Sequence, residues 1–162
     1  FSFSDNPIPP ERLRDYIFRW SAAGASEDAL RSWRALLLLR SGREDALRDL
    51  ATRCEDRHWL ALPVCRTLTE ARALAARAGG RLPIPDRPTL LHALRAFARP
   101  HGAIPLGLRS AEGPWDDGAP FTGSDSVETG GQDAACVYLN TVEPWLRLYP
   151  SLRTRLVIEW PA

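Results

Sequence analysis

Four short apolar runs in the last third of the chain constrain its fold most strongly. They read Ile-Pro-Leu-Gly-Leu at 104–108, Trp-Asp-Asp-Gly-Ala-Pro at 115–120, Cys-Val-Tyr-Leu-Asn at 136–140 and Leu-Val-Ile-Glu-Trp at 156–160. Connections rich in Gly, Pro, Ser and Asp separate these runs, and none of them keeps the 3.6-residue period of a helix. The pattern therefore predicts short strands joined by turns.

The connection between 120 and 136 is too long for an ordinary hairpin. Loops of this length inside a compact domain tend to be either functional or disordered. This segment is therefore the first candidate for a binding surface.

The composition fits one folded domain, with room for a small appendage. Of 162 residues, 44% are hydrophobic and six are Trp, which is ample for a packed core. The net charge is only +1, and a nucleic-acid or anionic-membrane surface would show a clustered basic excess. No apolar run approaches the length of a membrane span. All 21 basic residues are Arg, which we attribute to the codon usage of a GC-rich genome.

Residues 1–57 are predicted to form a lead-in of about three short helices. The first begins after Pro9 and ends at Gly24, and the second is capped by Ser26 and ends at 41–42. The third is expected over about 44–54, with Leu47 and Cys54 on its inner face. The three helices can form a small bundle or a cap on the rest of the chain, and we expect a structural role for them.

The pattern changes at residue 58. A strand is expected at 58–62, closed by Pro63, followed by a helix over 67–78 that stops at Gly-Gly. A brief extended segment at 81–85 precedes a helix over about 89–98. One strand, two helices and then several strands are typical of an α+β domain. We therefore divide the chain into a helical segment, 1–57, and a domain, 58–162.

The residues of 58–162 resemble a C-type lectin-like domain. The helix at 67–75 with Gly-Gly-Arg-Leu-Pro-Ile-Pro at 79–85 is similar to the family's first helix and the strand after it. The run at 104–108 resembles the "Trp-Ile-Gly-Leu" signature, with Pro105 in the Trp place. Trp115 with Asp-Gly at 117–118 and Pro120 is similar to the family's "Trp…Asp-Gly-x-Pro" turn. The family's last motifs are matched by Cys-Val at 136–137, Trp145 and Val-Ile-Glu at 157–159.

This resemblance implies two helices, short antiparallel strands and a long loop, but without the family's two disulfides. The first disulfide would join the positions of Ala75 and Ile158, which we expect to fill its volume by apolar contact. The second would join Cys136 to a position near Pro150, so Cys136 is expected to act as a small hydrophobe.

The three cysteines contain no Cys-x-x-Cys pair, which argues against a disulfide framework or a zinc site. We expect a cytoplasmic location rather than secretion. Because the chain starts at Phe1, we expect it to be a piece of a longer protein whose targeting is not visible.

Sugar-binding members of the family hold a Ca²⁺ ion with several oxygen ligands. The resemblance places those positions near Ser126, Glu128, Ala134, Leu146 and Arg147. An aliphatic side chain cannot ligate, and a guanidinium would repel the cation. The carboxylates of Asp125, Glu128 and Asp133 can supply oxygens after a register shift, or can simply be solvated. We expect no calcium site and no other cofactor.

Catalysis has little support in the sequence. His58, His92 and His101 are isolated from one another, and no nucleophile elbow or phosphate-binding glycine loop occurs. The Asp-Asp-Gly sequence at 116–118 is most simply a turn with Gly118 at positive φ. We expect no catalytic residues.

We therefore predict a non-enzymatic, calcium-independent recognition module. Its candidate ligand-binding residues are Phe121, Asp125, Glu128, Asp133, Arg147 and Tyr149, and Trp145 is either a further anchor or a core residue. The expected partner is a protein or another domain of the parent chain, with a glycan as a further possibility and no nucleic acid or membrane. A structural role in assembly and residual carbohydrate binding stay open as alternatives.

Overall fold

The computed structural model describes residues 8–108, 114–121, 127–128, 136–139, 145–148 and 152–161, the three short segments from 127 to 148 by backbone alone. The helices are α1 (Pro10–Ala22), α2 (Glu27–Arg40), η1 (Glu44–Leu50), α3 (Leu68–Arg77), α4 (Pro88–Ala98) and η2 (Arg99–His101). The strands are β1 (Thr52–Cys54), β2 (Arg57–Arg66), β3 (Ile104–Pro105), β4 (Val127–Glu128), β5 (Cys136–Leu139), β6 (Trp145–Leu148) and β7 (Thr154–Pro161). This order confirms the α+β prediction.

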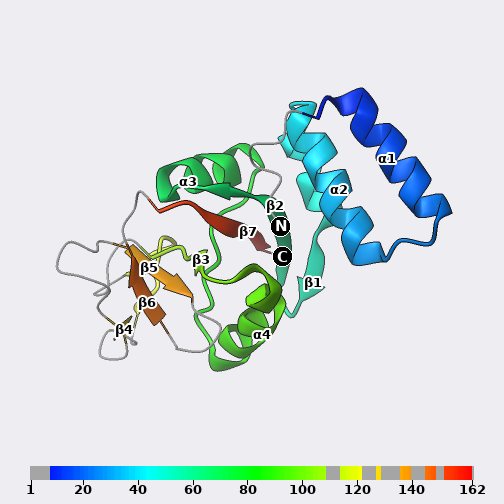
Figure 1. Ribbon diagram of the computed structural model, residues 1–162. Coiled ribbons are helices and arrows are strands. Elements are labelled where there is room, and N and C mark those ends of the chain that lie inside the picture. The colour runs from blue at the N-terminus through cyan, green and yellow to red at the C-terminus, as the bar shows by residue number, and fades with distance from the viewer. Residues whose placement is uncertain are drawn as a thin grey trace.

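The described strands form two sheets. The first has the order β1-β2-β7 and is antiparallel, and its central strand β2 pairs with β7 along nearly its whole length. The second has the order β3-β5-β6-β4, in which only the β4–β6 pair is parallel. Figure 1 shows β2 and β7 in the middle of the molecule, with the second sheet on the side away from α1 and α2.

The first sheet is covered on both faces, because successive residues of a strand point to opposite sides. On one face Leu60, Leu62 and Val64 of β2 pack with Ile158 and with the helices α2 and α3. On the other face Trp59 and Val157 pack with α4 and β3. Each strand therefore serves two cores, which explains why 156–160 is a nearly continuous apolar run.

The helical segment shares one of these cores. Leu13 of α1, Trp33 of α2 and Leu47 of η1 belong to the same cluster as Ala75 and Ile158. The two positions where the family would place a disulfide are therefore both buried in one apolar cluster, as expected. The division of the chain at residue 57 remains a prediction, although packing is continuous across it.

The predicted helix ends are confirmed by their caps. The Ser26 hydroxyl accepts a hydrogen bond from the backbone N–H of Ala29. Thr67 and Glu70 form a reciprocal capping box at the start of α3. After α3, Gly79 takes a φ of 76°, and a Cβ on Gly80 would lie 2.8 Å from the carbonyl oxygen of Glu159. The Gly-Gly pair thus both ends the helix and lets the chain pass directly against β7.

The third predicted helix is wrong in its second half. A 3₁₀-helix ends at Leu50, Ala51 is extended with ψ of 149°, and Cys54 lies on strand β1 instead of on a helix face. The β-branched Thr52 pairs with Trp59 of β2, so sheet pairing overrides the local helical period.

Three predicted strands also need correction. The run at 115–120 is a turn and not a strand, and Trp115 makes only an isolated bridge to Leu108. Strand β2 does not stop at Pro63 but continues to Arg66, and the pairing register shifts between Leu62 and Cys65. The irregularity accommodates the proline, which has no N–H for the ladder. The run at 104–108 is a strand only over Ile104–Pro105, because the N–H of Gly107 turns to the carbonyl oxygen of Pro83 instead.

No helix in the described part of the chain is long and apolar enough to cross a membrane.

Candidate functional site

The second sheet carries three of the predicted positions. Glu128 of β4 is in register with Leu146 of β6, and Arg147 of β6 is in register with Val137 of β5. The pairing therefore brings the backbones of Glu128 and Arg147 to neighbouring strands, one residue apart in register. Trp145 pairs with Val127 at the start of the same β4–β6 ladder.

Phe121 is anchored rather than freely exposed. Its ring meets that of Trp115 edge to face at a centroid distance of 5.2 Å, and it packs against the core beneath α4. A half-buried aromatic ring can still offer one face to a partner. The predicted residues Asp125, Asp133 and Tyr149 lie outside the described residues.

The acidic turn at 116–118 is structural, as predicted. Gly118 has a φ of 89°, and the Asp117 carboxylate accepts a hydrogen bond from the N–H of Ala119 at 3.0 Å. Asp116 forms an ion pair with Arg72 of α3. In the described ranges no three His, Cys, Asp or Glu side chains lie close enough together to hold a metal ion.

A buried ionic cluster centred on Glu159 ties β2, β7 and the 81–86 segment together. The Glu159 carboxylate is fully buried and accepts hydrogen bonds from Trp59 Nε1 at 2.9 Å and Arg81 Nε at 2.9 Å. It also accepts from Arg57 Nη1 and from the N–H of Ile84, both at 3.2 Å. Four donors converge on one carboxylate, so its lone pairs are well occupied.

The guanidinium of Arg57 also has several hydrogen-bond partners besides the Glu159 carboxylate. Its guanidinium also donates to the Ile84 carbonyl oxygen and to Asp86, each at 3.2 Å. Burial alone would lower the pKa of Arg57, but the nearby carboxylates of Glu159, Asp86 and Asp56 outweigh it and raise the pKa above its ordinary value. The cluster is therefore electrostatically compensated and serves to hold the fold.

His101 is partly buried and contacts Arg155 of β7. Its Nδ1 lies 3.2 Å from a guanidinium nitrogen of Arg155, and because arginine can only donate, Nδ1 must accept. Burial lowers the pKa of His101, and the charge of Arg155 lowers it further. The ring is held neutral beside a cleft of about 470 Å³ between α2, β2 and α4, whose walls include Asp28, Arg31 and Phe97.

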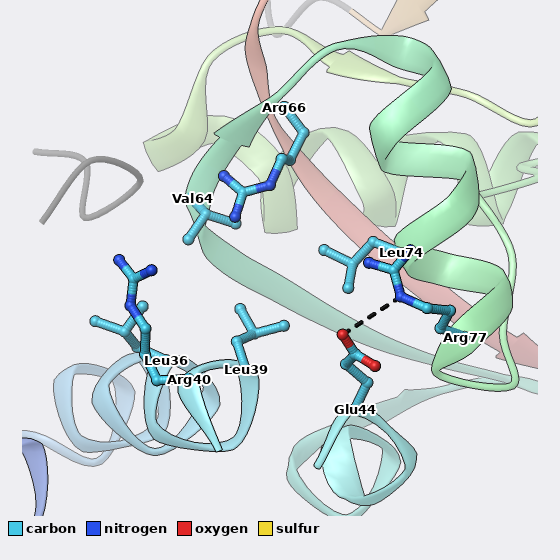
Figure 2. Close-up of a pocket in the computed structure, with 8 residues that line it drawn as sticks. All are labelled: Leu36, Leu39, Arg40, Glu44, Val64, Arg66, Leu74 and Arg77. Atoms are coloured by element: carbon cyan, nitrogen blue, oxygen red, sulfur yellow. Dashed lines mark hydrogen bonds and ion pairs between the residues drawn. The ribbon is translucent and has the colours of Figure 1, made fainter. Parts of the chain in front are cut away.

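A smaller recess, of about 90 Å³, lies where α2, η1, β2 and α3 meet. Its lining residues are Leu36, Leu39, Arg40, Glu44, Val64, Arg66, Leu74 and Arg77. In Figure 2, Arg40 and Arg66 reach toward the same side of the recess, whereas Arg77 points to Glu44 on the other side. The distance from Arg77 Nε to the Glu44 carboxylate is 3.4 Å.

Sequence reasoning missed both arginine clusters. The position of Glu159 within an apolar run could have predicted a buried ion pair, because a charge buried on a strand requires a partner. Nothing in the local sequence names Arg57 and Arg81 as those partners, 102 and 78 residues away. The recess carries no sequence signal, because its residues come from four separate elements.

The arrangement of helices and sheets is a C-type lectin-like fold. The carbohydrate-recognition domain of the mouse scavenger receptor C-type lectin matches it with a TM-score of 0.59 at 13% identity, covering 68% of this chain and 93% of that one. The human counterpart matches with a TM-score of 0.58 at 14% identity, covering 69% and 96%. No protein-family model and no curated protein matches the sequence. Identities this low show the fold alone.

Proposed function

We propose that this chain is a non-enzymatic, calcium-independent recognition module that binds a protein partner or another domain of its parent chain. The observation that carries the proposal is the identity of two residues on β6. Leu146 and Arg147 stand where the resemblance implies calcium ligands, on a strand paired with both β4 and β5. An aliphatic side chain and a guanidinium are poor surroundings for a hard cation.

The proposed binding surface is the edge of the second sheet with the segments that join its strands. Glu128 and Arg147 supply charges of both signs on neighbouring strands, and Phe121 supplies an anchored ring. Asp125, Asp133 and Tyr149 complete the proposed set. Mixed charge with aromatic and Arg anchors suits a protein surface, where such residues dominate the binding energy.

We keep an intracellular location as part of this proposal. The apolar burial of Ala75 and Ile158 supports it, because this packing needs no oxidising compartment to form.

A thermal melt with calcium and then with a chelator tests the calcium-independent part. A ligand that binds only the native state raises the melting temperature by mass action. We expect identical midpoints in calcium and in chelator, and no chelator-sensitive binding on a glycan array. A calcium-dependent rise in the midpoint would contradict the proposal and make Asp125, Glu128 and Asp133 ligands.

Paired capture experiments test the surface. The double variant Glu128→Ala, Arg147→Ala should lose a partner that the unchanged chain retains. Arg34→Ala, on the distant helix α2, is the matched control and should retain it. Equal capture by the double variant and the control would remove this surface from the proposal.

Assembly is a second candidate function, favoured by the exposed aromatic residues of α1. Phe18 is 77% exposed and Trp20 is 38% exposed. Light scattering tests this role, since a concentration-dependent mass lost in Phe18→Ser would support it. A monomer at every concentration would count against self-assembly.

A further inference from the structure

We propose that the cleft between α2, β1, β2, α4 and η2 binds a small aromatic carboxylate, that is, an anionic group carried on a flat apolar body. Phe97 contacts the apolar body, and His101 donates its Nε2–H to the carboxylate. The cleft is lined by different strands from those of the second sheet. The inference therefore stands independently of the recognition surface proposed above.

The cleft exists because β1 is shorter than the strand beside it. β1 pairs with β2 only from Thr52–Trp59 to Cys54–Arg57, and from Leu60 onward β7 is the only neighbour of β2 among the described strands. Thr52, Leu60 and Ala61 line the cleft at this open edge, and Figure 1 shows β1 between α2 and α4. The volume of about 470 Å³ lies within the range of ligand pockets, about 300–1,000 Å³.

Phe97 of α4 gives the cleft an aromatic wall. Its ring is supported from behind by the buried Trp59, at a centroid distance of 5.8 Å, and Phe97 itself is only half-buried. Leu60, Ala61 and Pro100 extend the apolar lining next to it. Aromatic rings pack favourably on one another in offset or edge-to-face arrangements, so this wall suits a flat apolar ligand.

His101 offers the cleft a hydrogen-bond donor whose tautomer is fixed. Its Nδ1 accepts from a guanidinium nitrogen of Arg155 at 3.2 Å, so the neutral ring carries its proton on Nε2. No described residue accepts a hydrogen bond from this Nε2–H. The positive charge on the other side of the ring polarises the imidazole, which strengthens Nε2–H as a donor to an anion.

The charges around the cleft favour an anion over a cation. Arg31 pairs with Asp28 at 3.2 Å, so these two charges compensate each other. Arg155 donates to the neutral His101 ring, and no described carboxylate pairs with it. Burial lowers the pKa of His101 and Arg155 lowers it further, with no described carboxylate acting against them. A carboxylate at Nε2 would supply the missing negative charge.

Titration of the ¹⁵N-labelled full chain with sodium benzoate, at constant ionic strength, tests the site. The Nε2 signal of His101 should shift and saturate, with a Kd of about 1 mM or tighter. Benzyl alcohol keeps the ring without the carboxylate, and sodium acetate keeps the carboxylate without the ring. Each should bind about tenfold more weakly or worse, because each lacks one of the two contacts. Shifts that stay linear with benzoate, or either half-probe binding as tightly as benzoate, would overturn the proposal.

Matched histidine variants separate the cleft from general binding to the surface. His101→Leu removes the donor and should weaken benzoate about tenfold or more. His92→Leu makes the same change at an exposed position of α4 that does not line the cleft, and it should leave the Kd unchanged. If His101→Leu does not fold, Arg155→Gln is the second test and should weaken benzoate about threefold or more, because it removes the charge behind the ring. Equal affinities in the cleft variant and the control would overturn the proposal.

Discussion

The two ends of strand β2 place arginines in opposite situations. Arg57 begins the strand and is buried against Glu159, Asp86 and Asp56, so its positive charge meets three carboxylates. Arg66 ends the strand near one carboxylate, Glu70, and two arginines, Arg153 and Arg40, and its side chain donates a hydrogen bond to a neutral carbonyl. One strand thus carries an arginine whose charge is compensated by carboxylates and an arginine whose charged neighbours include two other arginines.

The difference teaches that burial of an arginine does not by itself indicate its role. A buried ion pair contributes little net stability over an apolar replacement, but removing one partner is costly because the other charge is left behind. Where an arginine is partly buried beside other arginines, removing its charge relieves desolvation and repulsion instead. The two arginines should therefore respond to substitution with opposite signs.

The largest expected effect is the loss of the carboxylate at position 159. Glu159→Gln keeps the side-chain volume but leaves the buried Arg57 and the partly buried Arg81 without their common partner. We expect the free energy of unfolding to fall by about 3 kcal/mol or more. Urea denaturation followed by tryptophan fluorescence measures this, and a change below about 1 kcal/mol would show that the cluster is not essential to the fold.

A smaller effect of opposite sign is expected at the other end of β2. Arg66→Gln removes a partly buried positive charge near Arg153 and Arg40, and it should leave the free energy of unfolding unchanged or raise it by about 0.5 kcal/mol. Arg57→Gln is the matched comparison on the same strand and should destabilise. If Arg66→Gln lowers the free energy of unfolding as much as Arg57→Gln does, the two ends of β2 do not differ in the way proposed.

The smallest expected effect is the pH dependence of stability that comes from His101 and its contact with Arg155. The pKa of His101 is lowered from its ordinary 6.5, first by burial and then by Arg155, so below that pH the unfolded chain binds more protons than the folded one. The His101 contribution to stability should be complete above about pH 6.5 and decline as the pH falls toward the lower folded pKa.

His101→Gln retains an acceptor for Arg155 without a titrating ring, so it isolates this contribution. We expect the stability difference between the unchanged chain and the variant to shrink or reverse between about pH 7.5 and pH 5.5. Urea denaturation at both pH values measures it. A difference that stays constant with pH would mean that the folded chain does not lower the pKa of His101.

Local patterns were sufficient for much of the fold. The Ser26 cap and the Gly-Gly stop after α3 were both predicted, and each depends on residues within a few positions of each other. Sequence patterns also indicated the α+β order and the lectin-like arrangement. The predictions were wrong where long-range pairing decided, as at Thr52–Cys54, which a helical period suggested but β2 drew into a sheet.

The sequence by itself therefore determined the helix ends, the apolar strands and the chemistry available at each position, because propensity, capping and periodicity are short-range effects. Only the tertiary structure decided which charges meet. Glu159 and its arginine partners are brought together by the pairing of β2 with β7, and Arg40 approaches Arg66 because α2 packs on the same sheet face as α3. Electrostatic interactions depend on distance in space, which a chain acquires only when it folds.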